Sequence, residues 1–557
     1  MLKKYTYFRL GLIIVSCAGL TTLFSQQAVH LEKSALTEVE ELSESLANRL
    51  LDLSIVIRDR NFETISTFFA TEIQASNLPF PPFPSGKTIK WIDHNFLDIA
   101  SDVPWKTRLQ LIREWKKFLA AFSELEDVRF KVQNAQFRDT PRGKSGDGKI
   151  KFFLVGRDQS NKRLWVKGTG HILANQSEKT AWEISSLTFD HLETLRSNSD
   201  LFSEVSLPAG VSISIPPYGS PGNDNFVYHG AAVGDVNLDG FVDIITTDIQ
   251  KNHIYLNRGG TFHQPNLNLG LPPTPQATAP LLLDYDNDGD LDLFLAAVGH
   301  QWLFQNQLVP EGKLLFTDVS LEAGVALPAV GYSATAGDIN GDGQPDIYVA
   351  SYNHYGRIMP NSWHQATNGT ANLLFINQGN GSFKESSKVW GVRDMRWSYS
   401  SQMADVNGDG KLDLYVANDF GENALYINLG NSFEDQALSA GVLDPGNGMG
   451  VSFGDYNNDG HLDLYVTNMS STAGKRVLSR IFPQTGQGKK SVLNKLAAGN
   501  SLFQGRSDGS FSDVTEEMGP FVTGWGWGGV FLDFDNDGWE DIYCPNGFIS
   551  GKSMKDT

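Results

Sequence analysis

Residues 405–419, with the sequence DVNGDGKLDLYVAND, contain four Asp, two Asn and two Gly within fifteen positions. In the first nine of these residues, oxygen-bearing side chains alternate with other residues. The remainder, rich in β-branched and aromatic residues, is typical of a strand. Several carboxylates in one short turn repel one another unless a cation or open solvent compensates them. The stretch therefore predicts a cation-binding turn that leads into a strand.

The same nine-residue loop occurs six times, beginning at residues 235, 284, 338, 405, 455 and 533. A β-rich run follows each loop, and most of these runs continue into a segment similar to LYxNxGxxF. A strand of small residues, such as GMGVSFGD, then leads into the next loop. Four short strands in a unit of roughly fifty residues predict a β-propeller blade, so the fold class is mainly β.

Within each loop, positions 1, 3, 5 and 9 are Asp or Asn, and position 6 is Gly. Such an oxygen-only set suits Ca²⁺, which takes six to eight oxygen ligands, and position 7 offers its backbone carbonyl. The Gly permits the positive φ that turns the chain around the ion. The predicted metal-binding residues are Asp235, Asn237, Asp239, Phe241, Asp243, Asp284, Asp286, Asp288, Asp290, Asp292, Asp338, Asn340, Asp342, Gln344, Asp346, Asp405, Asn407, Asp409, Lys411, Asp413, Asp455, Asn457, Asp459, His461, Asp463, Asp533, Asp535, Asp537, Trp539 and Asp541.

Two alternatives to this calcium site are an EF-hand and a plain solvated turn. An EF-hand needs Glu at position 12, whereas these loops have Thr246, Leu295, Val349, Val416, Val466 and Cys544 there. Solvated Asp/Asn/Gly turns are common singly, but six loops in the same register disfavour that interpretation. The net charge of the chain is -19, and the six loops hold 22 acidic residues against one Lys. The acidity is therefore local to the loops, and it argues against a nucleic-acid partner.

The loops, together with FGDYNNDGHLDLYV, resemble FG-GAP or VCBS repeats, which occur in integrin α-subunit propellers and in the cartilage acidic protein group. The resemblance covers about residues 202–547. It implies a propeller of six to seven four-stranded blades with up to six Ca²⁺ ions, held by the Asp and Asn side chains at positions 1, 3, 5 and 9. We accordingly assign residues 200–557 to the propeller.

Residues 1–27 read as an export signal or an N-terminal anchor, because Lys3, Lys4 and Arg9 precede an apolar run over residues 10–24. Lipidation at Cys17 is a further alternative. Each of these interpretations places the body of the protein outside the cytoplasm, as a secreted, periplasmic or cell-surface protein. The other cysteine is Cys544, so no disulfide framework is expected.

Residues 34–197 predict a small α+β domain. Apolar residues recur at helical spacing over residues 36–69 and 109–125, and a Pro-rich connection lies between them. Strand-like segments follow at residues 128–137, 149–155, 164–172 and 181–189. The order of these elements resembles the nuclear-transport-factor or SnoaL-like cone.

The predicted function is an exported, calcium-binding platform for adhesion to an extracellular protein or glycan. Two inter-loop segments are candidate binding surfaces: residues 351–370, with Tyr352, His354, Tyr355, Trp363 and His364, and residues 470–500, with Lys475, Arg476, Arg480, Lys489, Lys490 and Lys495. Aromatic rings in the first could stack on a sugar or peptide, and the basic second segment could bind an anionic glycan or membrane. For both segments the alternative is an ordinary surface loop.

The rival function is an extracellular enzyme, a hydrolase or lyase, that uses the propeller as a scaffold. Its pocket would lie in the N-terminal domain, and His94, His171, Asp190 and His191 are the candidate residues. The sequence shows no nucleophile elbow, metal triad or phosphate loop. Four further side chains are candidates for a functional site: His253, His300, Trp525 and Trp527. The segment GWGWGG around the last two predicts a close-packed strand instead.

Overall fold

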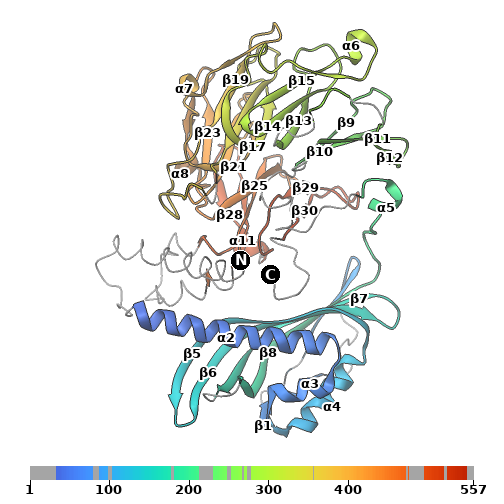
Figure 1. The fold of residues 1–557 in the computed structure, drawn as a ribbon, viewed down its shortest axis with the longest axis vertical. Helices are drawn as coiled ribbons and strands as arrows, with labels where there is room; N and C mark the ends of the chain where they lie inside the picture. Colours follow the sequence, from blue (N-terminus) through green and yellow to red (C-terminus); the bar gives the residue numbers. More distant parts are fainter. Residues whose placement is uncertain are drawn as a thin grey trace. The chain divides into compact units, whose positions relative to one another are not determined.

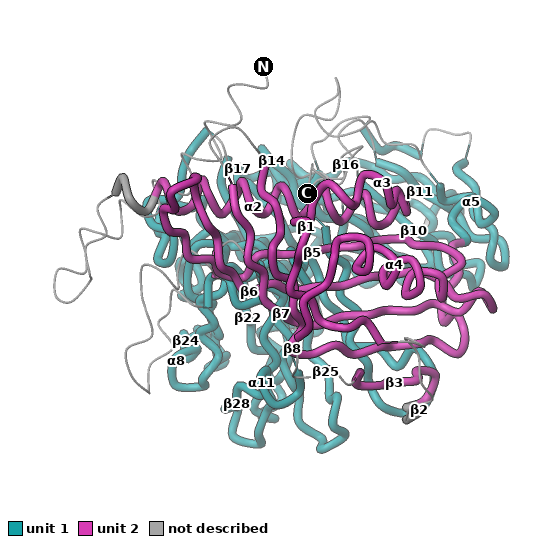
Figure 2. Tube along the Cα trace, turned by 90° about the horizontal axis from the view of Figure 1, so that it is seen from below, with its two compact units in different colours: residues 1–25, 205–471, 487–550 teal, residues 26–204, 472–486, 551–557 magenta. Residues whose placement is uncertain are grey.

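The computed structural model describes residues 33–79, 87–97, 99, 103–176, 181–212, 230–247, 252–265, 269–272, 277–354, 357–471, 474–475, 495–519 and 523–547. Over these residues the chain is mainly β, as predicted. It divides into two compact units, which Figure 2 colours separately: unit 1 is residues 1–25, 205–471 and 487–550, and unit 2 is residues 26–204, 472–486 and 551–557. The predicted export segment, residues 1–27, lies outside the described residues.

Unit 2 is a β-sheet with one long helix packed along it (Figure 1). The sheet order is β2-β3-β8-β7-β6-β5, and β1 pairs with both β4 and β8. Helix α2 buries Leu46, Leu50, Leu53 and Ile57, whose spacing of three and four residues places them on one helical face. The elements of this unit are α2 (Lys33–Arg58), α3 (Phe62–Ile65), a 3-10 turn (Ser66–Phe68), β1 (Phe69–Ala75), β2 (Lys87–Ile89), β3 (Ile92–Leu97), β4 (Trp105–Thr107), α4 (Arg108–Leu119), β5 (Phe122–Thr140), β6 (Gly143–Asp158), β7 (Arg163–Gln176) and β8 (Glu183–Ser197).

The four strands predicted in this unit are present as β5 to β8, and each is longer than predicted. The two predicted helices end early. The first stops at Arg58, since Arg60 adopts a positive φ of 54° and Asn61 caps the short α3 by accepting a hydrogen bond from Thr64 N. The second stops at Leu119, because Phe122 is fully buried as the first residue of β5. The apolar residues of 122–125 therefore belong to a strand, although their spacing fits a helix.

Unit 1 consists of antiparallel repeats, each containing one of the predicted loops between its first and second strands. Repeats 2 and 3 join into one eight-stranded sheet, because the end of β14 pairs with the start of β17. Repeats 1 to 5 have the four strands that the sequence predicts, and two strands of repeat 6 are described. Repeat 1 is β9 (Ala231–Gly234), β10 (Asp243–Thr247), β11 (Asn252–Asn257) and β12 (Phe262–His263); repeat 2 is β13 (Ala277–Leu283), β14 (Asp292–His300), β15 (Trp302–Asn306) and β16 (Phe316–Asp318); repeat 3 is β17 (Pro328–Gly337), β18 (Asp346–Ser351), β19 (Leu373–Asn377) and β20 (Phe383–Glu385); repeat 4 is β21 (Trp397–Ala404), β22 (Asp413–Asp419), β23 (Ala424–Asn428) and β24 (Phe433–Asp435); repeat 5 is β25 (Gly448–Gly454), β26 (Asp463–Asn468), β27 (Ser501–Gly505) and β28 (Phe511–Asp513); repeat 6 is β29 (Val530–Leu532) and β30 (Asp541–Tyr543).

Short helical turns join three pairs of consecutive repeats: α7 (Ser387–Trp390), α8 (Ala437–Ala440) and α11 (Thr515–Met518). Two further turns are α5 (Ser206–Ala209), which precedes repeat 1, and α6 (Leu308–Glu311), which lies within repeat 2. The turns α5, α7 and α8 each end at a Gly in the left-handed conformation, such as Gly441 with φ 82°. The Gly-Val pair that follows each of these three helical turns is therefore a helix C-cap.

The hydrophobic cores of unit 1 lie between consecutive repeats. One cluster joins repeat 2 to repeat 3, where the fully buried rings of Phe294 and Phe375 are 6.3 Å apart. Equivalent clusters join repeats 1 and 2, 3 and 4, 4 and 5, and 5 and 6. Each large side chain buried in this way contributes about 1.5–3 kcal/mol. The repeats therefore depend on their neighbours for stability.

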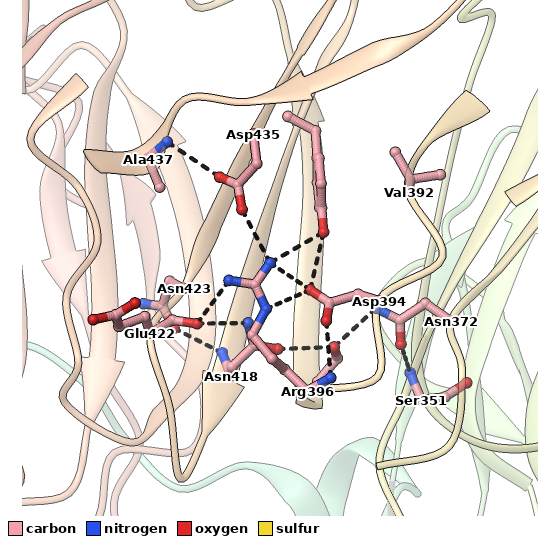
Figure 3. A network of polar contacts seen from close by, with 12 residues as sticks. Ser351, Asn372, Val392, Asp394, Arg396, Asn418, Glu422, Asn423, Asp435 and Ala437 are labelled. Atoms are coloured by element: carbon pink, nitrogen blue, oxygen red, sulfur yellow. Dashed lines mark hydrogen bonds and ion pairs between the residues drawn. The ribbon is translucent and has the colours of Figure 1, made fainter. Parts of the chain in front are cut away.

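A buried polar network centred on Arg396 supports repeat 4 (Figure 3). Arg396 Nε donates to Asp394 Oδ2 at 2.7 Å, and Nη2 donates to Asp435 Oδ2 at 3.1 Å. Tyr426 Oη donates to the same Asp394 oxygen at 3.0 Å. The two carboxylates and the carbonyl of Glu422, 3.3 Å from Nη1, hold the guanidinium in place. Asp394 is only 8% exposed, so its carboxylate has lost most of its hydration. The ion pair with Arg396 provides most of the compensation for that loss.

Candidate metal centre

The six predicted loops have the same backbone fold, and the position-1 Asp closes each of them. In the fourth loop, Asp405 Oδ1 accepts from Asp409 N at 3.1 Å and Oδ2 accepts from Gly410 N at 2.8 Å. The other five loops repeat both bonds. The Asp therefore ties positions 5 and 6 back to the start of the loop and turns the chain around a common centre.

Two positions of each loop adopt positive φ. Position 6, the Gly that the sequence predicts in this conformation, has φ between 82° and 101° in all six loops. Position 4 is also left-handed, with φ between 54° and 75°. Position 4 holds Gly or Asn in five loops and Leu238 in the first, where a branched side chain accepts a strained backbone.

Positions 3 and 5 direct their oxygens inward through short local hydrogen bonds. Position 5 accepts from the N–H of position 7 in every loop, as when Asp459 Oδ1 accepts from His461 N at 3.0 Å. In every loop except the second, position 3 accepts from the N–H of position 5, as when Asn457 Oδ1 accepts from Asp459 N at 3.1 Å. The side chains at position 7 differ widely, from a half-exposed Trp539 to a Lys411 that pairs with Asp409 at 2.8 Å. This variety agrees with a role for the backbone of position 7.

The position-9 Asp is the most buried member of each of the first five loops, and its side chain is fully inaccessible in all of them. In repeat 4, Asp413 Oδ2 accepts from Val406 N at 3.1 Å and Oδ1 accepts from Asn428 N at 2.8 Å. Repeats 1, 2, 3 and 5 make the equivalent pair of bonds. Position 9 thus fastens the loop to the third strand of its own repeat.

Burial without a cation raises the pKa of these position-9 carboxyls. Desolvation is the main cause, and the other loop carboxylates add to it through charge repulsion. The pKa rises to about 8 for Asp292, about 7 for Asp346, and about 6 for Asp413 and Asp463. A bound cation would remove this penalty.

In two loops, three carboxylates converge so closely that one ion could contact all of them. Oxygens of Asp284, Asp286 and Asp292 lie within 4.8 Å of one another, and so do oxygens of Asp533, Asp535 and Asp541. In the other four loops position 3 is Asn, which offers an amide oxygen in the same place. Asp286 Oδ1 is buried and has no hydrogen-bond partner. An orphaned carboxylate oxygen beside two other carboxylates fits a hard divalent cation.

The second loop differs from the rest at position 7. Asp290 is 1% exposed, its Oδ2 accepts from Val309 N at 2.7 Å, and its Oδ1 has no partner. Val309 lies in α6, so the Asp290 side chain ties the loop to an insertion in its own repeat. Burial raises the pKa of Asp290 to about 6.

An Asn at the end of the third strand connects consecutive loops, a role that we did not predict from the sequence. Asn306 Nδ2 donates to Val236 O at 2.9 Å, Asn377 Nδ2 to Tyr285 O at 2.8 Å, and Asn428 Nδ2 to Ile339 O at 2.8 Å. Each acceptor is position 2 of the loop in the preceding repeat. The signal was the Asn that recurs in the LYxNxGxxF segments, which we interpreted as part of a strand; repeat 5 has Gly505 in its place.

The candidate catalytic residues of unit 2 form two separate polar pairs. His94 Nε2 lies 2.8 Å from Glu193 Oε2, and His171 Nε2 lies 3.3 Å from Asp190 Oδ2. His171 and Asp190 are about half exposed, at 53% and 46%. The Phe96 ring lies against both the His191 ring and the His94 ring. The four candidates do not converge on one point, and large side chains fill the interior of the unit.

The first candidate binding segment, residues 351–370, folds against its own unit. Tyr352 is 5% exposed, while Trp363 is half-buried with its ring edge-on to Phe420 at 5.2 Å. His354 is exposed, His364 is half-buried, and Tyr355 lies outside the described residues. The expectation of an exposed aromatic platform is therefore wrong for Tyr352.

Most of the second candidate segment, residues 470–500, lies outside the described residues, including Arg476, Arg480, Lys489 and Lys490. Lys475 is described and exposed. Lys495 Nζ forms an ion pair with Asp513 Oδ2 at 2.8 Å. Among the described residues, no helix is long and apolar enough to cross a membrane.

The remaining single candidates have ordinary packing roles. His253 is 7% exposed and bonds to Gln264 Nε2 at 3.1 Å, whereas the exposed His300 lies against Trp302 at 4.0 Å. Trp525 and Trp527 are 5.8 Å apart. The strand predicted around them is wrong, since Trp525 and Gly526 form isolated bridges and β29 begins only at Val530.

Sequence families agree with this arrangement of loops and sheets. The FG-GAP-like repeat matches residues 221–295, 338–416, 405–466 and 492–544, and the FG-GAP repeat matches residues 447–493. The chain therefore belongs to the FG-GAP repeat family.

Curated relatives and solved structures give a more distant comparison. Cartilage acidic protein 1 of Homo sapiens is 24% identical over 392 residues, 60% of this chain and 58% of that protein. The Mus musculus protein is 25% identical over 245 residues, 42% of this chain and 32% of that protein. The chain thus spans less than two thirds of either relative.

Two solved structures are also similar. An Agrocybe aegerita lectin that recognises non-reducing terminal N-acetylglucosamine is 13% identical, covering 86% of this chain and 99% of its own, with a TM-score of 0.30. The V. cholerae biofilm matrix protein Bap1 is 17% identical, covering 55% of this chain and 42% of its own, with a TM-score of 0.22.

Proposed function

We propose that residues 205–547 form a calcium-loaded β-propeller that serves as a rigid binding platform. The observation that carries this proposal is the six-fold repetition of one loop geometry, in which inward oxygens surround a common centre at equivalent places in stacked sheets. Each ion would hold the turn between the first and second strands of its repeat. Fixing these turns preorganises the surfaces between repeats, which lowers the entropic cost of binding a partner.

The platform acts outside the cytoplasm in this proposal, on an extracellular protein or glycan. Membership of the FG-GAP family and the likeness to cartilage acidic protein 1 support it, as does the basic and apolar N-terminal segment. The same segment would allow attachment to a membrane through the N-terminus. A glycan and protein binding screen, run with and without chelator, tests the proposal. Loss of every interaction on chelation is the expected result, and binding that is unaffected by chelation would contradict the role of calcium.

Substitutions in the fifth loop test the assignment of ligands. Asp459→Ala removes a carboxylate from the centre of the loop, so we expect the variant to bind about one Ca²⁺ fewer than the parent and to unfold at a lower temperature. His461→Ala is the matched control, because it keeps the backbone carbonyl and the N–H that donates to Asp459. Metal counting by mass spectrometry compares the two. Equal calcium content in Asp459→Ala and the parent would require withdrawal of the ligand set.

The raised pKa values predict how stability depends on pH without calcium. A carboxyl whose pKa is higher in the folded than in the unfolded state binds more protons when folded, so stability falls as pH rises between the two values. Here the window runs from about 4, the unfolded value, to the folded values of about 6 to 8. In chelator, we therefore expect the Tm to decrease from about pH 5 to about pH 8.

With saturating calcium, the ions replace those protons, and the decrease should be smaller. Thermal unfolding monitored by circular dichroism at matched ionic strength measures both series. A Tm in chelator that rises over this pH range would show that the loop carboxyls are not the groups that titrate.

A further inference from the structure

One position in the first strand of the repeats is set apart by a β-bulge. The pairing with the second strand shifts by one residue at Thr278, Tyr332, Tyr399 and Met449. Each of these residues lies six positions before the first Asp of its loop, as does Trp527 in repeat 6. Six residues of strand place them roughly 20 Å from the metal centres. Bulges re-aim a side chain and occur often next to functional sites.

A cavity of about 590 Å³ lies between these first strands, on the loop side of the bulges. Apart from Pro345, the residues that line it precede loops 2 to 6 by one to four positions, among them Thr335, Ser401 and Gln402. Ser401 is 8% exposed, and its Oγ has no hydrogen-bond partner. The bulge-position residues are not among those that line this partly polar space, and they lie two or three residues farther from the loops along the same chain segments.

Three of the five bulge-position residues are aromatic, and their rings contact one another. We define the aromatic cluster as Tyr332, Tyr352, Tyr399 and Trp527. Tyr399 is edge-on to Tyr332 at 5.2 Å and 86°, and edge-on to Tyr352 at 5.6 Å and 82°. Trp527 lies 6.0 Å from Tyr399. Tyr352 is buried, whereas the other three rings are partly exposed and can contact a ligand.

The aromatic cluster has one acidic group, Asp419, at the end of β22. Tyr352 Oη donates to Asp419 Oδ2 at 2.6 Å, and Phe420 N donates to Oδ1 at 3.0 Å. Phe420 has a φ of 60°, so the backbone is strained beside this carboxylate. Among the described residues, no basic side chain forms an ion pair with Asp419. Burial raises the pKa of its carboxyl to about 6.

Other buried carboxylates outside the loops have a basic neighbour. Asp394 pairs with Arg396 and Asp158 with Arg196, while the charge of Lys495 partly opposes the desolvation that raises the pKa of Asp444. Asp419 instead resembles the loop carboxylates, whose counter-charge in the proposed function comes from outside the chain. A single carboxylate offers too few oxygens for Ca²⁺, which needs six to eight. The missing positive charge must therefore be of another kind.

We propose that the aromatic cluster and Asp419 bind an alkylammonium group, the cation interacting with the ring faces and with the carboxylate. This inference rests on the proposed binding platform and gives its ligand a chemical class. Aromatic faces attract ammonium ions, and the attraction strengthens where water is excluded. A sugar ring would be better served by one flat, open aromatic platform. Here Tyr332 and Tyr352 stack on each other at 4.5 Å, and the Tyr399 ring stands at right angles to both.

Ligand-observed NMR on the full chain in saturating calcium tests the proposal. The probes are tetramethylammonium, a quaternary ion, and n-butylammonium, a primary one. Neopentyl alcohol is the neutral counterpart of the first, and N-acetylglucosamine represents a sugar. We expect saturable binding of at least one ammonium probe, at least about tenfold tighter than neopentyl alcohol. The better probe distinguishes a quaternary headgroup from a lysine-like amine.

Two variants and their matched controls locate the site. Asp419→Asn should weaken ammonium binding at least about tenfold, whereas Glu422→Gln, which removes the same charge three residues away, should change it less than about twofold. Tyr399→Leu should weaken binding similarly, and Tyr399→Phe, which retains the ring, should not. Calcium content and Tm, measured on each variant, show whether the propeller itself is intact. No saturable binding of either ammonium ion, equal binding by Asp419→Asn, or preferential binding of the sugar would overturn the inference and leave the calcium platform untouched.

Discussion

Chelation of calcium by EGTA is expected to lower the Tm of the chain more than any single substitution considered above. An ion bound only by the folded state adds about 2.7 kcal/mol at a hundredfold excess over its Kd, and six loops are available. Without ions, the position-9 carboxylates face their loop neighbours with raised pKa values and no compensating charge. Differential scanning calorimetry in calcium and in EGTA measures the difference.

Two controls make this result specific. Calcium added back in excess should restore the original Tm, while Mg²⁺ at the same concentration should restore less, because it demands a smaller octahedral shell. Unit 2 contains none of the loops, so an unfolding transition that belongs to it should not shift. Equal Tm values for unit 1 in calcium and EGTA would mean that the loops are stable turns without ions.

The loops were predictable because their information is local. The spacing of oxygen-bearing residues, and the Gly at position 6 with its positive φ, follow from nine consecutive letters. Position 4 has the same backbone requirement but was missed, since Leu238, Asn287 and Gly341 all fill it. Several residue types satisfy this requirement for a positive φ, and Leu238 does so under strain. Such a requirement produces no clear pattern in a single sequence.

The connection between loops was not predictable from local patterns. Asn377 Nδ2 reaches Tyr285 O across 92 residues, and Asn428 Nδ2 reaches Ile339 O across 89. The LYxNxGxxF segment shows that an Asn recurs, but its acceptor lies in the preceding repeat. Only the stacking of the sheets brings the two together.

In unit 2, strand prediction succeeded where alternation was long and failed where strands were short. Strands β5 to β8 have buried and exposed residues that largely alternate over 14 to 19 residues, which the sequence pattern predicts well. Strands β2 and β4 have three residues each, too few to show a period. The aromatic residues of 351–370 were misjudged for a related reason, because Tyr352 is buried by rings from β17 and β21 that lie far along the chain.

Replacement of Arg396 by Met is expected to destabilise unit 1 by about 3 kcal/mol, at the lower end of the cost of breaking a buried ion pair. The side chain of Asp394 is 6% exposed, and the variant leaves its carboxylate with the hydroxyl of Tyr426 and one backbone N–H as donors. We expect the loss of folding free energy to lie at the lower end because Arg396 is itself 21% exposed, so water can enter beside the new side chain. Urea unfolding in saturating calcium measures the loss separately from any effect on the ions.

A double-mutant cycle identifies the ion pair as the cause. Asp394→Asn added to Arg396→Met removes the uncompensated charge, so the double variant should be more stable than Arg396→Met alone. Asp435→Asn is the matched control, because this carboxylate contacts the same guanidinium but is 37% exposed and should cost less than about 1 kcal/mol. If Asp435→Asn destabilises the unit as much as Arg396→Met, the more exposed ion pair between Arg396 and Asp435 stabilises the network, and the pair with Asp394 is not the main contribution. If the double variant is less stable than either single variant, the packing of the Arg396 side chain matters more than its charge.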